Sequence, residues 1–364
     1  MILGLILAVG ESLSDFKAKG QLKRLIDYNI RKYSNSFDKV FIFSYAKESF
    51  KTDKKIFLIP NKSGFHRYLY AIFMPIIHRK IFNQCNILRC LQLTGGIPAF
   101  ISKAIFGKKF VINYGYDYVN FAKIESKPLQ MCAYKIITKP LLKFADAVIV
   151  TSNEIKKEIS KIIPSSKVFY IPNGVDTKKF KGSKNNKNKI LKITFMGRLE
   201  KQKNLKNLIR AVLSIKKPIK LEFYGKGSQK KELLNLARKS GVNLSIYDPV
   251  EYEKVPNVLA SCDIFALTSI VEGNPKILLE AMACEKAVIG SNVDGTKELI
   301  KNGQTGILTN TDYPSIAKAI NKLDNTKLRN KLGKNARRFI TKNFNIDQTL
   351  EKEMNLLKMT ANER

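Results

Sequence analysis

The sequence of 364 residues contains no tryptophan, only five cysteines and only two histidines. Five cysteines are an odd number, and no two of them have the C-x-x-C spacing. This argues against a disulfide framework and against a structural zinc site, and it indicates a reducing compartment, for which we expect the cytoplasm. Long hydrophobic runs are also missing. The longest runs, residues 1–10 and 68–77, have about half of the ~20 residues that a membrane-spanning helix needs.

The apolar start of the chain predicts a buried strand. Residues 1–10 have no basic segment before their apolar part, and no credible cleavage site follows, so a secretory signal peptide is not expected. Apolar residues make up 44 % of the whole sequence, which is usual for globular proteins. At about 150 residues per domain, the length predicts two domains.

Acidic residues are scarce, with 30 Asp and Glu against 65 Lys and Arg, which gives a formal net charge of +35. Of the basic residues 53 are lysines, as an AT-rich genome would encode, so the total charge alone does not identify a partner. Its distribution is more informative. Between Asp53 and Asp117 there is no carboxylate, although ten Lys or Arg residues occur there.

Within this acid-free stretch, residues 64–82 read GFHRYLYAIFMPIIHRKIF, with aromatic and aliphatic residues between basic ones. This pattern favours a helix that lies in the interface of an anionic membrane or binds an anionic acceptor. The alternative is an internal helix whose basic side chains extend to water. The residues expected on such a surface are Arg67, His78, Arg79 and Lys80.

Apolar runs of strand length alternate with amphipathic stretches in both halves of the chain, which predicts parallel sheets built from βαβ units. The strands expected in the first half are residues 1–9, 40–44, 55–59, 86–93, 109–113 and 147–151. Those expected in the second half are residues 191–196, 219–224, 243–247, 263–268 and 287–291, with helices over 204–214, 228–240, 255–261 and 276–284. The C-terminal region predicts helices over 313–323, 327–344 and 347–359.

These patterns predict an α/β protein with two Rossmann-like domains. The N-terminal domain is expected over residues 1–172, a polar and basic linker over 173–189, and the C-terminal domain over 190–344. In two joined α/β domains of this kind, a ligand cleft is expected between them, at the carboxyl ends of the strands.

The segment EGNPKILLEAMA, residues 272–283, has the chemistry of a ligand site. A tight turn leads into a helix, and Pro275 in the first turn needs no N–H group. The backbone N–H groups at such a helix start can bind a diphosphate or a sugar hydroxyl. Glu272 and Glu280 lie about two helical turns apart, and a carboxylate can accept two hydrogen bonds from vicinal hydroxyls. The alternative is that both glutamates are solvated helix charges.

This segment resembles the E-G-x-P-x-x-x-x-E-A-M-A signature of the retaining glycosyltransferases of family 4, which have the two-domain GT-B fold. Further motifs of that family are matched in the same order along nearly the whole chain. They are VTSNEIKKEI at residues 150–159, IPNGVDTKKF at 171–180, FMGRLEKQKN at 195–204 and YGKGSQKKELLNLA at 224–237. The resemblance also implies that a C-terminal helix over residues 345–364 returns to the N-terminal domain.

The resemblance implies a role for each matched residue. Arg198 and Lys203 would bind the donor diphosphate, Glu280 the ribose, and Glu272 the donor sugar. The backbone amides of the turn before the helix would also bind the donor sugar and phosphate. This turn consists of Gly273, Asn274, Pro275 and Lys276, of which Pro275 has no N–H group. The nucleotide base would lie near Tyr247 and Val250. Gly20 matches a glycine of the N-terminal domain whose amide faces the phosphate, although the family often has two adjacent glycines there.

One position departs from the family pattern. Where many members have a His-Asp or His-Gly pair, this chain has Tyr116 and Asp117. Asp117 could accept the proton of the acceptor hydroxyl or bind a sugar hydroxyl, or it could cap the following turn. The family's retaining reaction is ascribed to front-face attack assisted by the leaving phosphate, without an established protein nucleophile. The chain has no D-x-D motif and no metal-ligand cluster, so we expect no metal and no cofactor besides the nucleotide sugar.

The resemblance therefore implies a transferase that moves a hexose or N-acetylhexosamine from a UDP- or GDP-linked donor. The acceptor would be a lipid-linked or phosphorylated glycan in the synthesis of a cell-surface polysaccharide such as lipopolysaccharide. We expect the enzyme to be peripheral on the inner face of the cytoplasmic membrane. Two alternatives are another enzyme of the same fold, such as a sugar-nucleotide epimerase or a phosphorylase, and a basic nucleic-acid-binding protein. Only charge supports the last, so no nucleic-acid partner is expected.

Overall fold

The computed structural model describes residues 1–50, 54–182 and 190–363, which form two compact units. Unit 1 consists of Met1–Val119, Leu129–Ile171 and Leu350–Arg364, and unit 2 of Asn120–Pro128 and Pro172–Thr349. The chain thus leaves unit 1 close to the expected boundary at residue 172. The expected linker over 173–189 stays a prediction, because residues 183–189 lie outside the described part.

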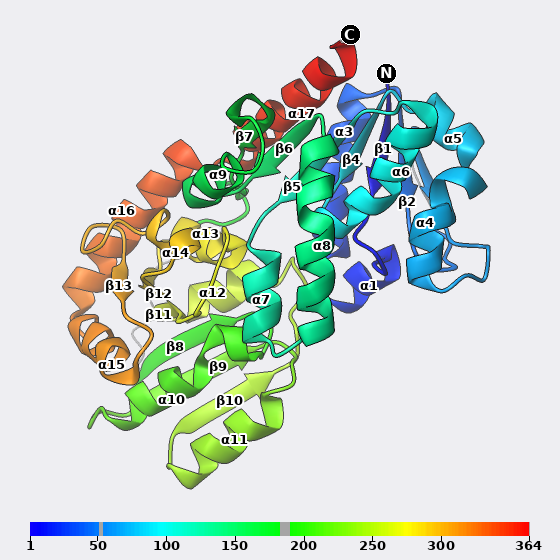
Figure 1. The fold of residues 1–364 in the computed structure, drawn as a ribbon. Coiled ribbons are helices and arrows are strands. Elements are labelled where there is room, and N and C mark those ends of the chain that lie inside the picture. The colour runs from blue at the N-terminus through cyan, green and yellow to red at the C-terminus, as the bar shows by residue number, and fades with distance from the viewer. Residues whose placement is uncertain (51–53, 183–189, 364) are drawn as a thin grey trace. The chain divides into compact units, whose positions relative to one another are not determined.

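Unit 1 is built on a parallel sheet of seven strands in the order β3-β2-β1-β4-β5-β6-β7 (Figure 1). The strands are β1 (Ile2–Ile6), β2 (Lys39–Phe43), β3 (Ile56–Ile59), β4 (Ile87–Cys90), β5 (Phe110–Tyr114), β6 (Ala147–Val150) and β7 (Val168–Tyr170). All but β7 were expected from their runs of Ile, Leu, Val and Phe. At three residues, β7 is too short for a recognisable pattern.

Helices cover both faces of this sheet. They are α1 (Leu13–Ala18), α2 (Leu22–Leu25), the π-helix η1 (Ile26–Ile30), α3 (Arg31–Ser36), α4 (Arg67–Ile77), α5 (Arg79–Gln84), α6 (Gly96–Phe106), α8 (Pro128–Phe144), α9 (Asn153–Ile159) and the end of α17 (Ile346–Asn362). Short 3-10 turns, η2 (Leu93–Gly95) and η3 (Ser165–Lys167), precede α6 and β7. The segment 64–82 forms two helices rather than one, since α4 ends at Ile77 and α5 begins at Arg79, with His78 between them.

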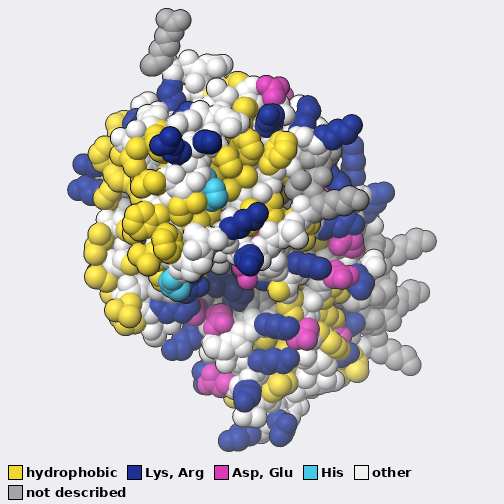
Figure 2. All heavy atoms as spheres, turned by 90° about the vertical axis from the view of Figure 1, so that its right-hand side faces the viewer, with side chains coloured by type: hydrophobic (Ala, Val, Ile, Leu, Met, Phe, Trp, Pro, Cys, Tyr) yellow, Lys and Arg dark blue, Asp and Glu magenta, His cyan; other side chains and the backbone are white. Residues whose placement is uncertain are grey.

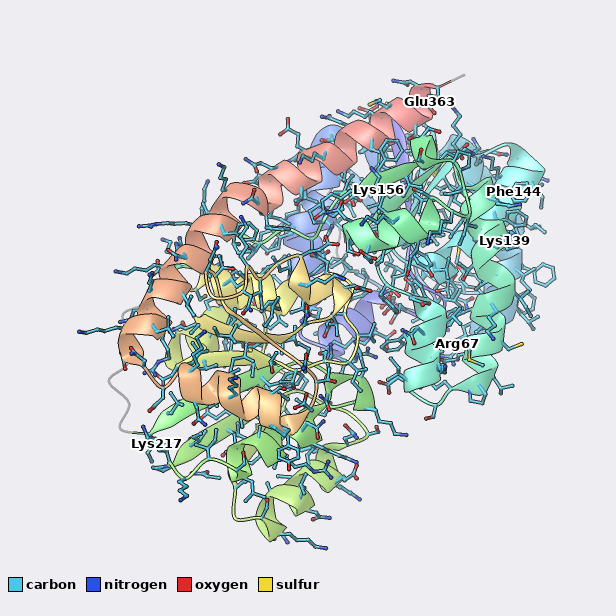
Figure 3. The ribbon with its side chains drawn as sticks, turned by 60° about the vertical axis from the view of Figure 1, so that its left-hand side comes forward. Arg67, Lys139, Phe144, Lys156, Lys217 and Glu363 are labelled. Atoms are coloured by element: carbon cyan, nitrogen blue, oxygen red, sulfur yellow. The ribbon has the colours of Figure 1, made fainter. Side chains whose placement is uncertain are left out.

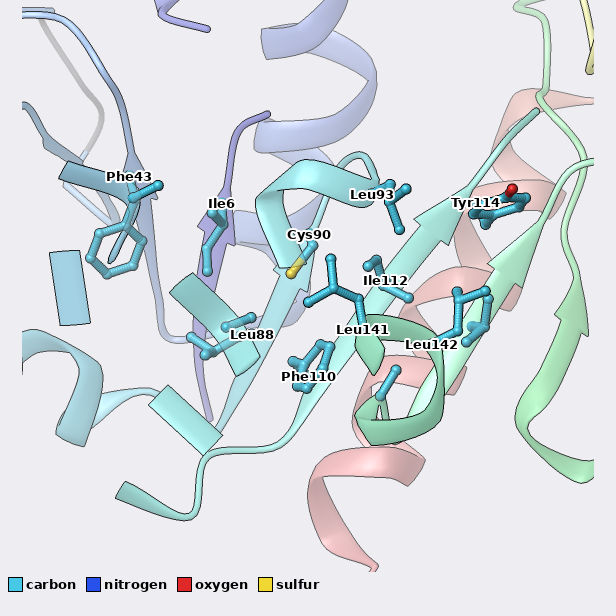
Figure 4. Packing of buried hydrophobic residues seen from close by; sticks show 14 of the residues in the cluster. Ile6, Phe43, Leu88, Cys90, Leu93, Phe110, Ile112, Tyr114, Leu141 and Leu142 are labelled. Carbon is cyan, nitrogen blue, oxygen red and sulfur yellow. The ribbon is translucent and has the colours of Figure 1, made fainter. Parts of the chain in front are cut away.

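The core of unit 1 has two parts, one on each face of the sheet. Figure 4 shows the part under α8, where Leu141 and Leu142 pack among strand residues such as Leu88, Phe110 and Ile112. On the other face, Leu356 and Leu357 of α17 pack with Tyr33 and the residues of β1 and β2. Each buried Leu contributes about 1.5–3 kcal/mol relative to an exposed one. The C-terminal segment is therefore part of the core of unit 1.

Unit 2 is built on a parallel sheet of six strands in the order β10-β9-β8-β11-β12-β13. Its strands are β8 (Leu191–Met196), β9 (Ile219–Tyr224), β10 (Asn243–Tyr247), β11 (Ile264–Leu267), β12 (Ala287–Ser291) and β13 (Ile307–Thr309). Its helices are α7 (Tyr118–Ile124, mostly within this unit), η4 (Lys201–Lys203), α10 (Leu205–Leu213), α11 (Lys230–Lys239), α12 (Val255–Ser261), α13 (Lys276–Ala283), α14 (Asp294–Lys297), α15 (Tyr313–Lys322) and α16 (Thr326–Asn343). The three-residue strand β13 was not expected.

Each unit is thus a parallel sheet covered by helices, and the fold is the α/β class with two Rossmann-like domains that the sequence predicted. Among the described residues, no helix combines the length and the apolar character needed to cross a bilayer.

Candidate functional site

Four loops of unit 2 meet at one edge of its sheet. They follow β9, β8, β11 and β12, which are neighbours in the sheet, so their carboxyl ends lie side by side. The first two loops touch through glycines: a Cβ atom on Gly225 would lie only 1.8 Å from the carbonyl oxygen of Gly197. A side chain at Gly225 would therefore push apart the two loops that carry the basic residues and the G-x-G motif.

The loops after β8 and β11 are joined by an ion pair between Lys203 and Glu272. Lys203 Nζ lies 2.5 Å from Glu272 Oε1, and both side chains are largely buried. The hydroxyl of Ser269 also donates to Glu272 Oε1, at 2.6 Å. Two residues predicted to touch the donor are thus in direct contact, although 69 positions separate them in the sequence.

Gln202 and Asn204 connect these two loops through hydrogen bonds. The amide of Ile270 donates to the carbonyl of Gln202, and the Gln202 side chain donates to the carbonyl of Val271. The Asn204 side chain donates to the carbonyls of Thr268 and Thr311, while its backbone adopts the left-handed conformation (φ 56°) that favours Asn or Gly. No role was predicted for these two residues, although they flank the predicted Lys203 in the motif FMGRLEKQKN.

Arg198 is exposed, and its guanidinium lies 5.0 Å from the ring centre of Phe121. One of its nitrogens also donates a long hydrogen bond of 3.4 Å to the side chain of Gln202. Nearby, the carboxylate of Glu125 accepts from the amide of Gln202 at 3.1 Å. Residues 120–128 therefore help to position both the arginine and the loop that contains Lys203. The sequence did not indicate this role.

The turn before α13 is packed on both sides. Asn274 is buried and forms two hydrogen bonds with Asn173, whose amide donates to Asn274 Oδ1 and whose side chain donates to the Asn274 carbonyl. On the other side, the amide of Gly295 donates to the carbonyl of Glu272, and a Cβ on Gly295 would lie 1.9 Å from the carbonyl oxygen of Gly273. This explains Asn173 in the N-G-V-D motif. It also identifies Gly295 as a structural residue that the sequence analysis missed.

Pro275 is the residue that immediately precedes α13, which begins where the sequence predicted. The helix begins at Lys276, which is exposed, and in the described chain no side chain caps its amino end. Glu280 lies on α13 and is only 3 % exposed. It is therefore not a solvated helix charge, which was the alternative left open by the sequence.

Tyr247 and Val250 lie at and beyond the end of β10, two strands away from β8. Tyr247 stacks on Tyr224 of β9, with 4.8 Å between the ring centres, and Tyr247 remains 41 % exposed to solvent. The stacked pair offers an aromatic surface at the same sheet edge as Lys203 and Glu272, which suits a flat base.

Three predicted residues of unit 1 have local partners. The amide of Gly20 donates to the carbonyl of Lys17 at 2.9 Å, so this turn would have to open before the amide could bind a phosphate. Tyr116 stacks on Tyr118, with ring centres 4.2 Å apart. The carboxylate of Asp117 accepts from the amide of Val119 at 3.0 Å. Asp117 thus caps the following turn, which is one of the three roles considered for it, and its two roles toward the acceptor stay predictions.

The four residues expected on a basic surface differ in their surroundings. Arg79 and Lys80 are exposed. Arg67 is also exposed, and its side chain lies over Gly10, where a Cβ would be 2.7 Å from Arg67 Cδ. His78 differs from these three residues. It is half-buried, its Nε2 lies 2.9 Å from the hydroxyl of Tyr70, and burial lowers its pKa.

The side chains at this edge of unit 2 have the chemistry that a nucleotide sugar requires. Basic side chains suit a diphosphate, carboxylates suit hydroxyl groups and the aromatic surface suits a base. The residues that the structure describes contain no group of three or more His, Cys, Asp or Glu that could hold a metal ion.

Comparison with known proteins identifies the family of the chain. Residues 175–339 match the family described as glycosyl transferases group 1, and residues 50–179 match glycosyltransferase family 4. An uncharacterized glycosyltransferase of Methanocaldococcus jannaschii, MJ1069, is 31 % identical over 283 residues, which cover 72 % of this chain and 71 % of that protein.

Other relatives have more specific names. The UDP-Gal:alpha-D-GlcNAc-diphosphoundecaprenol alpha-1,3-galactosyltransferase of Escherichia coli is 28 % identical over 71 % of both chains. Among solved structures, the sucrose-phosphate synthase of Thermosynechococcus elongatus is similar with a TM-score of 0.84 at 17 % identity, over 99 % of this chain and 98 % of that one. HepE of Anabaena, solved with UDP and glucose, gives a TM-score of 0.78 at 18 % identity, over 98 % and 99 %. These structures establish the likeness of fold.

Proposed function

Because the chain belongs to the glycosyl transferases group 1, we propose that it is a retaining hexosyltransferase that uses a nucleoside diphosphate sugar. Its substrates are a UDP- or GDP-linked hexose or N-acetylhexosamine and a lipid-linked or phosphorylated glycan, in the synthesis of a cell-surface polysaccharide. The name of the Escherichia coli relative supports this acceptor class, because that enzyme acts on a sugar attached to diphosphoundecaprenol. A second relative, from Campylobacter jejuni, is 33 % identical over 127 residues, a third of each chain, and its name also contains a diphospho-undecaprenol acceptor.

The observation that carries the proposal is the contact of Lys203 with Glu272 at the amino end of α13. When the sugar leaves its nucleotide, negative charge grows on the diphosphate. Lys203 and Arg198 meet that charge with a point charge and a planar fork, on loops already held in place by Gln202 and Asn204. Glu272, released from part of its contact with Lys203, accepts hydrogen bonds from the sugar hydroxyls. Buried Glu280 binds the ribose.

The anomeric carbon and the attacking acceptor hydroxyl need no further group from the chain. In a front-face reaction the leaving phosphate oxygen takes the proton of the acceptor hydroxyl, while the new glycosidic bond forms on the side of the departing diphosphate. The anomeric configuration is thereby retained. The charge that a metal ion would neutralise is met by Arg198 and Lys203, so we propose that turnover needs no divalent cation.

Transfer takes place at the inner face of the cytoplasmic membrane, where a lipid-linked acceptor is anchored. The acid-free stretch of unit 1 supports this location, since its exposed Arg67, Arg79 and Lys80 suit an anionic surface.

The test is a thermal shift measurement with UDP, GDP, ADP and UMP, each with EDTA and with magnesium. A ligand at 100 times its dissociation constant adds about 2.7 kcal/mol of stability, which raises the melting temperature by several degrees. We expect one nucleoside diphosphate to produce such a shift in EDTA. Arg198→Ala and Glu280→Gln should abolish it, whereas Arg210→Ala, on the exposed side of α10, should leave it unchanged.

Product analysis by proton NMR then tests the stereochemistry, because the anomeric coupling constants of donor and product must agree. An inverted product would contradict the retaining reaction. A diphosphate shift that appears only with magnesium would contradict metal independence.

A further inference from the structure

Two helices of unit 1 expose large apolar side chains to solvent. On α4 these are Tyr68, Leu69, Ile72, Phe73, Ile76 and Ile77, which recur in pairs at every fourth position. On α8 they are Leu129, Ile136 and Phe144, with exposed Ala133 and Pro140 between them. Leu129 is 86 % exposed and Ile136 is 67 % exposed. Both sets follow the period of one helix face, so each helix has a continuous apolar stripe.

The two stripes belong to one surface. α4 packs on α6, and Phe100 of α6 lies 5.1 Å from Phe144 of α8 between ring centres. Burial and, secondly, the neighbouring Tyr68 of α4 raise the pKa of Tyr134 on α8. Figure 2 shows hydrophobic side chains gathered over this face of the molecule, with basic side chains around them. We call this surface, formed by the exposed residues of α4 and α8, the α4–α8 face.

Its charge is of one sign. Residues 54–116 and 127–145 contain no Asp or Glu, so neither helix carries a carboxylate. Exposed Lys135, Lys139 and Lys143 lie four residues apart on α8, next to the apolar stripe. Figure 3 labels Lys139 and Phe144 on this helix. Exposed basic residues also lie at both ends of α4, with Arg67 at its first position and Arg79 and Lys80 just beyond its last.

We propose that the α4–α8 face docks on a bilayer of anionic lipids, with both apolar stripes in the acyl boundary and the basic residues at the headgroups. The chemistry of the surface selects this partner. Apolar side chains with basic flanks match an interfacial helix, and the absence of carboxylates favours an anionic partner. A second copy of the chain would place two positive surfaces against each other, which disfavours self-association through this face.

The α4–α8 face also extends to the carboxyl edge of the sheet in unit 1. α4 begins at Arg67, which lies over Gly10 in the turn after β1. A docked bilayer would therefore bring lipid headgroups to the sheet edge where an acceptor binds. This last step rests on the proposed transfer to a lipid-linked acceptor, whereas the docking itself does not.

Sedimentation of the full-length protein with vesicles tests the proposal. One set contains 30 mol% phosphatidylglycerol in phosphatidylcholine, and the other contains phosphatidylcholine alone. The triple variant Lys135→Gln, Lys139→Gln and Lys143→Gln should weaken binding to the anionic vesicles by about tenfold or more. The matched control is Lys327→Gln, Lys331→Gln and Lys334→Gln, which removes the same charge from exposed positions of α16 in unit 2 and should change binding little.

Insertion of the apolar stripes needs its own measurement. Since the chain has no tryptophan, Phe73→Trp and Ile136→Trp each introduce a single reporter. Their emission should shift to the blue with anionic vesicles and be quenched by brominated lipids, whereas that of Tyr313→Trp in unit 2 should not.

Equal loss of binding in the two lysine variants would overturn the proposal, because attraction would then follow total charge alone. Unshifted emission at positions 73 and 136 would also overturn it, as would concentration-dependent dimerisation through these residues in sedimentation velocity runs. Each variant is also tested for the thermal shift by UDP and GDP. If neither UDP nor GDP shifts the melting temperature of the unsubstituted protein, the proposed function is contradicted. If the unsubstituted protein does not bind anionic vesicles, the docking is contradicted.

Discussion

Arg89 on β4 and Glu353 on α17 form a buried ion pair, with Arg89 Nε 2.5 Å from Glu353 Oε1. The hydroxyl of Tyr33 donates to the same carboxylate oxygen at 2.7 Å. Burial and the nearby carboxylate raise the pKa of Tyr33 well above its usual range, so it remains a donor at any physiological pH. Three elements of unit 1 are thus joined at one buried carboxylate.

Removing that carboxylate should be costly. Glu353→Ala leaves the guanidinium of Arg89 buried and without its counter-charge, which we expect to lower the free energy of unfolding by about 3–5 kcal/mol. Urea denaturation measures this. Glu351→Ala, an exposed position on the same helix, is the control and should change stability by less than about 0.5 kcal/mol. The double variant Arg89→Met and Glu353→Leu should recover part of the loss. Equal stability of the Glu353 and Glu351 variants would contradict a structural role for the pair.

The contact of Lys203 with Glu272 predicts a defect in turnover. Lys203→Met should lower kcat by about 10²–10³-fold, the usual effect of removing one group that stabilises transition-state charge. Lys206→Met is a matched control, since Lys206 forms an exposed ion pair with Glu232 on the same unit. Single-turnover rates with the nucleotide sugar identified by thermal shift measure both. A normal single-turnover rate for Lys203→Met would show that this residue does not stabilise the transition state.

Gly295 offers a test of the turn that carries Glu272 and Gly273. A methyl group at Gly295 would overlap the carbonyl of Gly273, so Gly295→Ala should displace this turn and weaken nucleotide binding by tenfold or more, at about 1.4 kcal/mol per factor of ten. Gly115→Ala, where the nearest atom would be 3.3 Å away, should leave nucleotide binding unchanged. Isothermal titration gives both affinities. Equal nucleotide affinities of the two variants would show that the turn accommodates a methyl group at position 295.

His78 should make stability depend on pH. Burial lowers its pKa in the folded protein below the ordinary value of 6.5 that applies when the chain is unfolded. Below that value the unfolded chain binds more protons than the folded one, so stability falls as the pH is lowered through 6.5 toward the folded pKa. His78→Gln should remove this contribution, which is seen as a smaller loss of stability between pH 7 and pH 5.5. Identical pH profiles would show that His78 titrates alike in both states.

The cysteines should react very unequally. Burial raises the pKa of Cys85, Cys90, Cys262 and Cys284 to about 12, whereas Cys132 is exposed on α8. Ellman's reagent should therefore titrate one thiol in the native protein and five in denaturant. Anionic vesicles should slow the reaction of Cys132, because it lies on the helix that we place at the bilayer. A second fast thiol in the native protein would contradict the burial of the other four.

The sequence predicted the strands well, because a buried parallel strand is a run of apolar residues whatever its neighbours are. It did not predict β7 and β13, which have three residues each, or the π-helix Ile26–Ile30, whose local pattern is that of an ordinary helix. It did not reveal the exposed stripe of α8 either. That helix carries apolar residues on both its buried and its exposed sides, so periodicity alone cannot tell which side packs on the sheet.

The candidate site was predictable to the extent that its residues lie in motifs. Lys203 and Glu272 were both named from the sequence, but their contact depends on two loops meeting in space. Glu125, Gln202 and Gly295 act through backbone contacts that have no residue pattern of their own. His78 was assigned to the surface because it lies between basic residues, and only the packing of Tyr70 against it shows that it is half-buried.

The dependence of unit 1 on α17 has a consequence for biosynthesis. Residues 1–171 leave the ribosome before α17, but the core of unit 1 includes fully buried Leu357, and its Arg89 is paired with Glu353 of the same helix. The N-terminal unit therefore cannot complete its fold during translation until α17 has emerged. A stop codon just before Leu350 would remove this part of α17 and so damage the part of the protein that was made first.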